Sequence, residues 1–155
     1  MLPLKKICCP TDFSEPSQEA LKVACEMAAH FGAELILVHV VTPIPVIPIH
    51  DDPTSFNLPL YEKEMEQSAI KSLKKLQQEK VTQSIRSRTA VIQGDPSTQI
   101  VTLADTENMD MIIIATHGFT GWRKFMFGSV TEKVIRLANC PVLSIRMPPP
   151  QQQQE

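Results

Sequence analysis

The chain has 155 residues, of which 43% are apolar, and this length and composition fit one globular domain. Lys and Arg number 15 against 17 Asp and Glu, so the formal net charge is −2, which disfavours a nucleic-acid partner. No apolar run approaches the roughly 18 residues of a membrane helix, and the first residues lack a signal-peptide pattern. We therefore expect a cytoplasmic protein that binds neither nucleic acid nor membrane.

The four cysteines are Cys8, Cys9, Cys25 and Cys140. They form neither a CxxC pair nor the paired spacing of a zinc site. Because Cys8 and Cys9 are neighbours in an apolar run, their side chains should point to opposite faces of a strand. We expect all four to be reduced, buried side chains rather than redox groups or metal ligands.

In the first half of the chain, apolar runs alternate with an amphipathic segment. Strands are predicted at Lys6–Pro10 and Ala33–Val41, and the second is almost unbroken in its apolar residues, as in a strand covered on both faces. Between them, apolar residues at three- and four-residue spacing predict a helix from about Glu15 to Phe31. Segment 42–59 carries five prolines, which exclude a regular helix or central strand, so we expect a long loop there.

The second half continues the alternation. Alternating polar and apolar residues from Ile85 to Ile92 predict an edge strand. Asp95 and Pro96 are start signals for a helix, as a cap and as a residue suited to the first helical position. The other predicted segments are a helix from about Leu60 to Glu79, the Pro96 helix to about Glu107, a buried strand at Met109–Ala115, a helix from about Ser129 to Ala138, a strand at Val142–Arg146 and a disordered tail at 148–155.

Strands that alternate with helices predict right-handed crossovers and hence a single α/β domain, residues 1–147, with a doubly wound, five-stranded parallel sheet and helices on both faces. In such sheets, ligands bind at the carboxyl ends of the strands, where the direction of winding reverses. The residues that follow the predicted strands are therefore the candidates for a binding site.

Two polar loops follow predicted strands. Pro10–Ser14, PTDFS, comes after the first strand, and a glycine-bearing loop with Gly118 comes after the fourth, with Gly128 and Ser129 opening the next helix. Glycine lets backbone N–H groups converge on an anion, and a helix N-terminus adds unpaired donors and a favourable dipole. These loops predict phosphate binding, although neither a Walker loop nor a GxGxxG motif is present.

These residues resemble the universal stress protein family, whose nucleotide-binding members share the pattern Gly-x2-Gly-x9-Gly-Ser/Thr. Here the pattern reads Ala115-x2-Gly118-x9-Gly128-Ser129, with alanine in place of the first glycine. The likeness extends from Lys5 to Arg146 and includes PTDFS, LVHV, GDP and CPVL. It implies the sheet order 3-2-1-4-5, which puts the reversal between the first and fourth strands.

The resemblance also implies a site for ATP, or for AMP or ADP, with Mg²⁺. Adenine would face Asp12 and the backbone of Val40, Ala115 would border the ribose, and the start of the fourth helix would bind phosphate. The predicted site residues are Pro10, Thr11, Asp12, Val40, Ala115, His117, Gly118, Gly128, Ser129 and Val130.

Simpler interpretations stay open for several of these residues. Ser129 with Glu132 has the spacing of a capping box, and Asp12 could be a plain helix cap. His117 could approach phosphate, but it has no second histidine at metal-ligand spacing. His39, inside an apolar run, is interpreted as a hydrogen-bonded core histidine rather than a ligand.

The sequence contains no recognisable catalytic apparatus, neither a nucleophile elbow nor paired carboxylates. We therefore expect a nucleotide-dependent regulator of the stress response with at most slow ATP hydrolysis. The alternative is a nucleotide-free protein-interaction module of the same fold, which Ala115 would favour. The resemblance further implies a homodimer through the fifth strand, Val142–Arg146.

Overall fold

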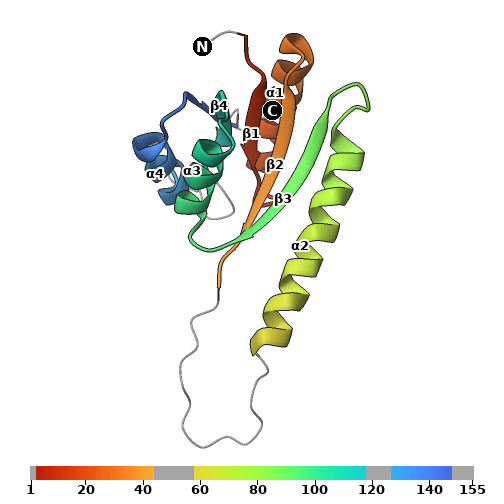
Figure 1. Ribbon diagram of the computed structural model, residues 1–155, viewed down its shortest axis with the longest axis vertical. Helices are drawn as coiled ribbons and strands as arrows, with labels where there is room; N and C mark the ends of the chain where they lie inside the picture. Colours follow the sequence, from red (N-terminus) through yellow and green to blue (C-terminus); the bar gives the residue numbers. More distant parts are fainter. Residues whose placement is uncertain (1–2, 44–57, 118–126, 148–155) are drawn as a thin grey trace, which may run out of the picture.

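The computed structural model describes residues 3–43, 58–117 and 127–147, in which strands and helices alternate along the chain (Figure 1). All strand pairings are parallel, and the strand order is β3-β2-β1-β4-β5. The predicted fold class and strand order are thus confirmed. The elements are β1 Lys6–Pro10, α1 Glu15–Phe31, β2 Glu34–Val41, α2 Leu58–Lys80, β3 Ser87–Gln93, α3 Pro96–Thr106, β4 Met111–Ala115, α4 Ser129–Leu137 and β5 Val142–Ile145.

The core has two halves, one on each face of the sheet. On one face, Leu35 and Leu37 of β2 belong to the same buried cluster as residues of α1 and α2, such as Leu21 and Leu73. On the other face, Ile36 and Val38 pack in a cluster with residues of α3 and α4. Because successive side chains of a strand point to opposite faces, a strand covered on both sides is apolar at its buried positions on both faces, as β2 is from Leu35 to Val38.

The predicted elements differ from the observed ones mainly at their ends. Helix α2 begins at Leu58 rather than Leu60, so Pro59 lies in its first turn, where a missing N–H is tolerated. The third strand is at the edge of the sheet, as expected, but it begins at Ser87 and not at Ile85. Most of the predicted 42–59 loop and the predicted 148–155 tail lie outside the described residues.

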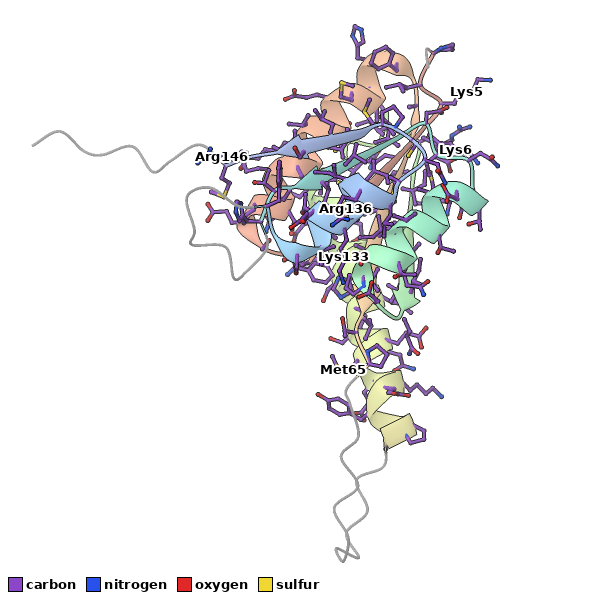
Figure 2. All side chains as sticks on the ribbon, turned by 90° about the vertical axis from the view of Figure 1, so that its left-hand side faces the viewer. Lys5, Lys6, Met65, Lys133, Arg136 and Arg146 are labelled. Carbon is purple, nitrogen blue, oxygen red and sulfur yellow. The ribbon has the colours of Figure 1, made fainter. Side chains whose placement is uncertain are left out.

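The N-terminal half of α2 extends past the end of the sheet (Figure 1). Here Leu60 and Met65 are 53% and 38% exposed, and Figure 2 shows Met65 on the projecting part. Burial begins one turn later, at Ala69, and continues at Leu73 and Leu76. Helix α2 therefore packs into the core through its C-terminal half.

Two of the four cysteines are buried as expected, whereas Cys25 and Cys140 are half-buried. All four are free thiols, and burial raises the pKa of each, that of Cys8 to about 12. A raised pKa keeps a thiol protonated and unreactive at neutral pH, so the interpretation of these residues as packing groups agrees with the structure. In the part of the chain that the structure describes, no helix combines the length and apolarity needed to cross a membrane.

Candidate functional site

A cavity of about 300 Å³ opens at the carboxyl ends of β1, β2 and β4. This volume is at the lower end of the range for small-molecule sites, about 300–1,000 Å³. Strand β1 lies between β2 and β4, so the winding of the chain reverses beside it and leaves a crevice there. Nine of the ten predicted site residues line the cavity, namely Pro10, Thr11, Asp12, Val40, Ala115, His117, Gly128, Ser129 and Val130.

The tenth predicted residue, Gly118, lies outside the described residues. The cavity is also lined by residues that the sequence did not single out, such as Val38 of β2, Ile100 of α3 and Thr131 of α4. Their apolar or β-branched character is that of ordinary core positions. Only the tertiary arrangement places them at a cavity.

Thr11, directly after β1, is held through its N–H and its hydroxyl by three other residues. Its N–H donates to the Val38 carbonyl at 2.8 Å, continuing the pairing of β1 with β2. Its side-chain oxygen lies 2.9 Å from the Ser17 hydroxyl in α1 and accepts the Phe13 N–H at 3.0 Å. Thr11 is 7% exposed, and its hydrogen bonds fix the first residue of the turn that leads into α1.

Asp12 supports the start of α1 without capping it. The N-cap is Ser14, whose hydroxyl accepts the Ser17 N–H, so the cap interpretation of Asp12 was wrong. One carboxylate oxygen of Asp12, Oδ1, accepts the Ser14 N–H at 3.0 Å and a bond from the Ser14 hydroxyl. The other, Oδ2, has no partner among the described residues, which leaves an acceptor at the cavity.

Helix α4 begins differently from the capping-box prediction. Its N-cap is Gly128, with no side-chain cap bond, so Ser129 is the first helical residue and Glu132 lies one position too late for a capping box. The Gly128 N–H donates to the Thr116 carbonyl at 2.7 Å and is not available to a ligand. The N–H groups of Ser129 and Val130 have no partner among the described residues, so this helix N-terminus offers them as donors at the cavity.

Thr131 ties α4 to the end of β4. Its hydroxyl donates to the Ala115 carbonyl at 2.7 Å, and Thr131 is 4% exposed. A buried hydrogen bond of this kind holds the first turn of the helix against the strand. The S-V-T order at 129–131 carries no signal that separates this role from an ordinary helical threonine, so sequence reasoning missed it.

His117 follows β4 and carries an unusual polar atom. Its Nδ1 lies 3.0 Å from the Thr116 hydroxyl, whereas its Nε2 is buried without a hydrogen-bond partner among the described residues. Buried polar atoms are nearly always paired, so an unpaired one at a cavity indicates a place for a ligand atom or a water. His39, the second histidine at the cavity, is half-buried, and its Nδ1 lies 2.8 Å from the Thr11 carbonyl oxygen.

Few charged side chains line the cavity among the described residues. Asp12 is the only acidic residue among its described lining residues, and none of these is a lysine or arginine. Lys133 and Arg136 of α4, labelled in Figure 2, are exposed and do not line the cavity. Among the described lining residues, the α4 N-terminus is the feature that favours a bound anion. Arg123 and Lys124 lie outside the described residues.

Comparison with known proteins identifies the family of this chain. A sequence model of the universal stress protein family matches residues 3–146. The chain is 35% identical over 144 residues to universal stress protein MJ0531 of Methanocaldococcus jannaschii, covering 93% of this chain and 83% of that one. The solved structure of the protein MJ0577 has a TM-score of 0.79 at 28% identity and covers 94% of this chain and 98% of its own.

Two further solved structures contain adenine nucleotides. A universal stress protein in complex with cAMP has a TM-score of 0.59 at 23% identity, covering 92% of this chain and 97% of that one. One from Archaeoglobus fulgidus in complex with dAMP has a TM-score of 0.55 at 23% identity, covering 94% and 99%. At this identity the likeness is one of fold. With the family match over nearly the whole chain and the shared fold, this chain belongs to the universal stress protein family.

Proposed function

We propose that this protein binds ATP with Mg²⁺ in the cavity and acts as a nucleotide-dependent regulator of the stress response, with at most slow ATP hydrolysis. One observation carries the proposal: unpaired hydrogen-bonding groups gather where the sheet winding reverses. The groups without a partner among the described residues are Asp12 Oδ2, the buried Nε2 of His117, and the N–H groups of Ser129 and Val130.

These groups differ between the two ends of the cavity. At the β1 end, the Asp12 carboxylate is an acceptor for the amino group of adenine. At the α4 end, the Ser129 and Val130 N–H groups and the helix dipole favour a phosphate, and His117 Nε2 would pair with a phosphate oxygen. Universal stress proteins with bound cAMP and dAMP support an adenine nucleotide as the ligand class.

A magnesium ion would arrive with the nucleotide and be held mainly by its phosphates and by water. The described residues contain no group of three or more His, Cys, Asp or Glu side chains that could hold a metal. Mg²⁺ is usually bound through substrate phosphates, several waters and one or two carboxylates, so it needs no protein cage. Asp12, the only carboxylate on the described wall, would be engaged by the base, which leaves no carboxylate to activate water and makes hydrolysis slow.

Calorimetric titration with ATP and with AMP, each with and without Mg²⁺, tests the proposal after removal of any co-purified nucleotide. Micromolar ATP binding that depends on Mg²⁺ would support it, and tight AMP with weak ATP would change the role to a sensor of energy charge. Absence of binding to both would overturn it. That result would favour the nucleotide-free interaction module, for which Ala115 in place of the glycine pattern is the motive.

We further propose a homodimer formed through β5. This strand is at the edge of the sheet, and its four residues, Val142–Ile145, are only half-buried. An edge strand with unpaired backbone groups is stabilised by pairing with a second strand. A second copy of the chain would supply that strand in antiparallel orientation.

A further inference from the structure

Among the described residues of β2, His39 is the one whose side chain hydrogen-bonds to the turn after β1. Its Nδ1 lies 2.8 Å from the carbonyl oxygen of Thr11, across 28 residues of sequence. A carbonyl oxygen only accepts hydrogen bonds, so Nδ1 must carry the proton and donate. The interpretation of His39 as a hydrogen-bonded core histidine is therefore only part of its role, because the bond reaches a residue of the site.

The Thr11 carbonyl belongs to the peptide group that joins Thr11 to Asp12. A trans peptide is planar, so a bond to its oxygen fixes the orientation of the plane that carries the Asp12 nitrogen. The Thr11 N–H and hydroxyl are bonded as well, to Val38 and to Phe13 and Ser17. The His39 bond thus completes the set of hydrogen bonds that fixes the orientation of Thr11. It therefore also fixes the position of the Asp12 backbone nitrogen.

The backbone of the turn is strained at the next residue. Phe13 has φ of +67°, a left-handed conformation that non-glycine residues rarely adopt. Its ring packs on that of His39, with centroids 4.5 Å apart and planes at 37°. Such conformations persist only where surrounding contacts enforce them. His39 supplies two of these contacts, a hydrogen bond before Asp12 and a ring contact after it.

We infer that His39 is a positioning residue for base recognition: its Nδ1–H and ring hold the Thr11–Phe13 turn so that Asp12 Oδ2 faces the nucleotide base. The inference rests on the proposed binding of an adenine nucleotide. It predicts selectivity for a base with an exocyclic amino group. The carboxylate accepts a hydrogen bond from the 6-amino group of adenine, whereas hypoxanthine presents a carbonyl oxygen there and would be repelled.

The two contacts of His39 can be separated by substitution. His39→Phe keeps a ring beside Phe13 but removes the donor. His39→Asn keeps a donor, because its amide nitrogen is attached to Cγ just as Nδ1 is, but it removes the ring. The wild type and both variants are titrated calorimetrically with ATP and with ITP in the presence of Mg²⁺, and their thermal unfolding is recorded.

The wild type should prefer ATP to ITP by about tenfold or more, as expected for a site built to bond an amino group. His39→Phe should bind ATP about tenfold more weakly while its ITP affinity stays unchanged, and His39→Asn should recover most of the loss. A purely structural role would instead weaken both nucleotides equally and lower the melting temperature in parallel, with no recovery in His39→Asn. That pattern overturns the inference.

The ¹⁵N NMR spectrum of the native protein gives an independent test that does not depend on how the variants fold. The inference requires a protonated Nδ1 on His39, and an unprotonated Nδ1 overturns it. The titrations also separate this inference from the proposed function. A wild type that binds neither nucleotide removes the proposed function and the inference with it, whereas ATP selectivity that persists in His39→Phe removes the inference alone.

Discussion

Replacing Gly128 by valine should strongly weaken ATP binding and leave the fold intact. Gly128 has φ of −61°, which every L-residue adopts, and an added Cβ would lie 3.4 Å from the Thr116 carbonyl oxygen and 3.7 Å from His117 Cα. Neither contact forces the backbone to move. The two methyl groups of valine, however, would stand at the α4 N-terminus, where phosphate must approach the Ser129 and Val130 N–H groups.

The expected change in stability is small because two terms oppose each other. Loss of glycine from the unfolded chain stabilises the protein by about 0.4–1 kcal/mol. Loss of a favourable N-cap residue costs about 0.5–1 kcal/mol. The free energy of unfolding should therefore change by less than about 1 kcal/mol, which corresponds to a melting-temperature shift of about 4 °C or less for a chain of this size.

Calorimetric titration with Mg-ATP and thermal unfolding followed by circular dichroism measure the two effects. Gly128→Val should lose more than about tenfold in ATP affinity, equivalent to about 1.4 kcal/mol. Gly128→Ala, which adds only the Cβ, serves as the control and should lose less. A Gly128→Val protein that melts near the wild-type temperature and binds ATP with wild-type affinity would refute the placement of phosphate at this helix N-terminus.

Four further outcomes are expected. Ala115→Gly should change ATP affinity by less than about tenfold in calorimetry, whereas a larger gain would show that the natural site is compromised. Thr131→Val removes the hydroxyl bonded to the Ala115 carbonyl and should lower the free energy of unfolding by about 1–3 kcal/mol in urea, with Thr131→Ser losing less. Bonds from Ser97 and then Thr98 lower the pKa of Asp95 from 3.8 to about 2, so its stabilising effect is complete above about pH 4 and lost as the pH falls through about 2. The gap in melting temperature between wild type and Asp95→Ala should therefore close over that range, and a gap that does not depend on pH would contradict it. Light scattering should give twice the 17.3 kDa chain mass at micromolar concentration, and a monomer would contradict the β5 dimer.

Local patterns were sufficient for most of the secondary structure. Helix α1 and strand β1 begin and end at the predicted residues, and Asp95 caps α3 as expected, accepting the Thr98 N–H at 3.0 Å. These features depend on interactions within a few residues, such as a side-chain oxygen that reaches an N–H three positions later. The helices and strands themselves are visible in the sequence as apolar residues that recur every 3.6 or every 2 residues.

The start of α4 shows where such reasoning ends. Ser129 and Glu132 satisfy the capping-box spacing, yet Gly128 is the N-cap. The choice is made by the hydrogen bond from the Gly128 N–H to the Thr116 carbonyl, a contact between the helix and the end of β4 that the local sequence does not encode. A local motif gives way when a tertiary bond fixes the position of the first turn.

The sequence alone therefore predicted the parallel α/β architecture, which the structure confirms, because buried strands and amphipathic helices appear as periodic patterns along the chain. It also predicted nine residues that the structure places around one cavity. Only the tertiary structure decided which polar groups remain for a ligand. The Thr11 hydroxyl and the N–H groups of Thr11 and Gly128 form hydrogen bonds within the protein. Asp12 Oδ2 and His117 Nε2, by contrast, are left without a partner among the described residues. His39 belongs to the site through a bond across 28 residues. A hydrogen bond between distant residues depends on how the strands are brought together, and no pattern within a single strand or helix specifies it.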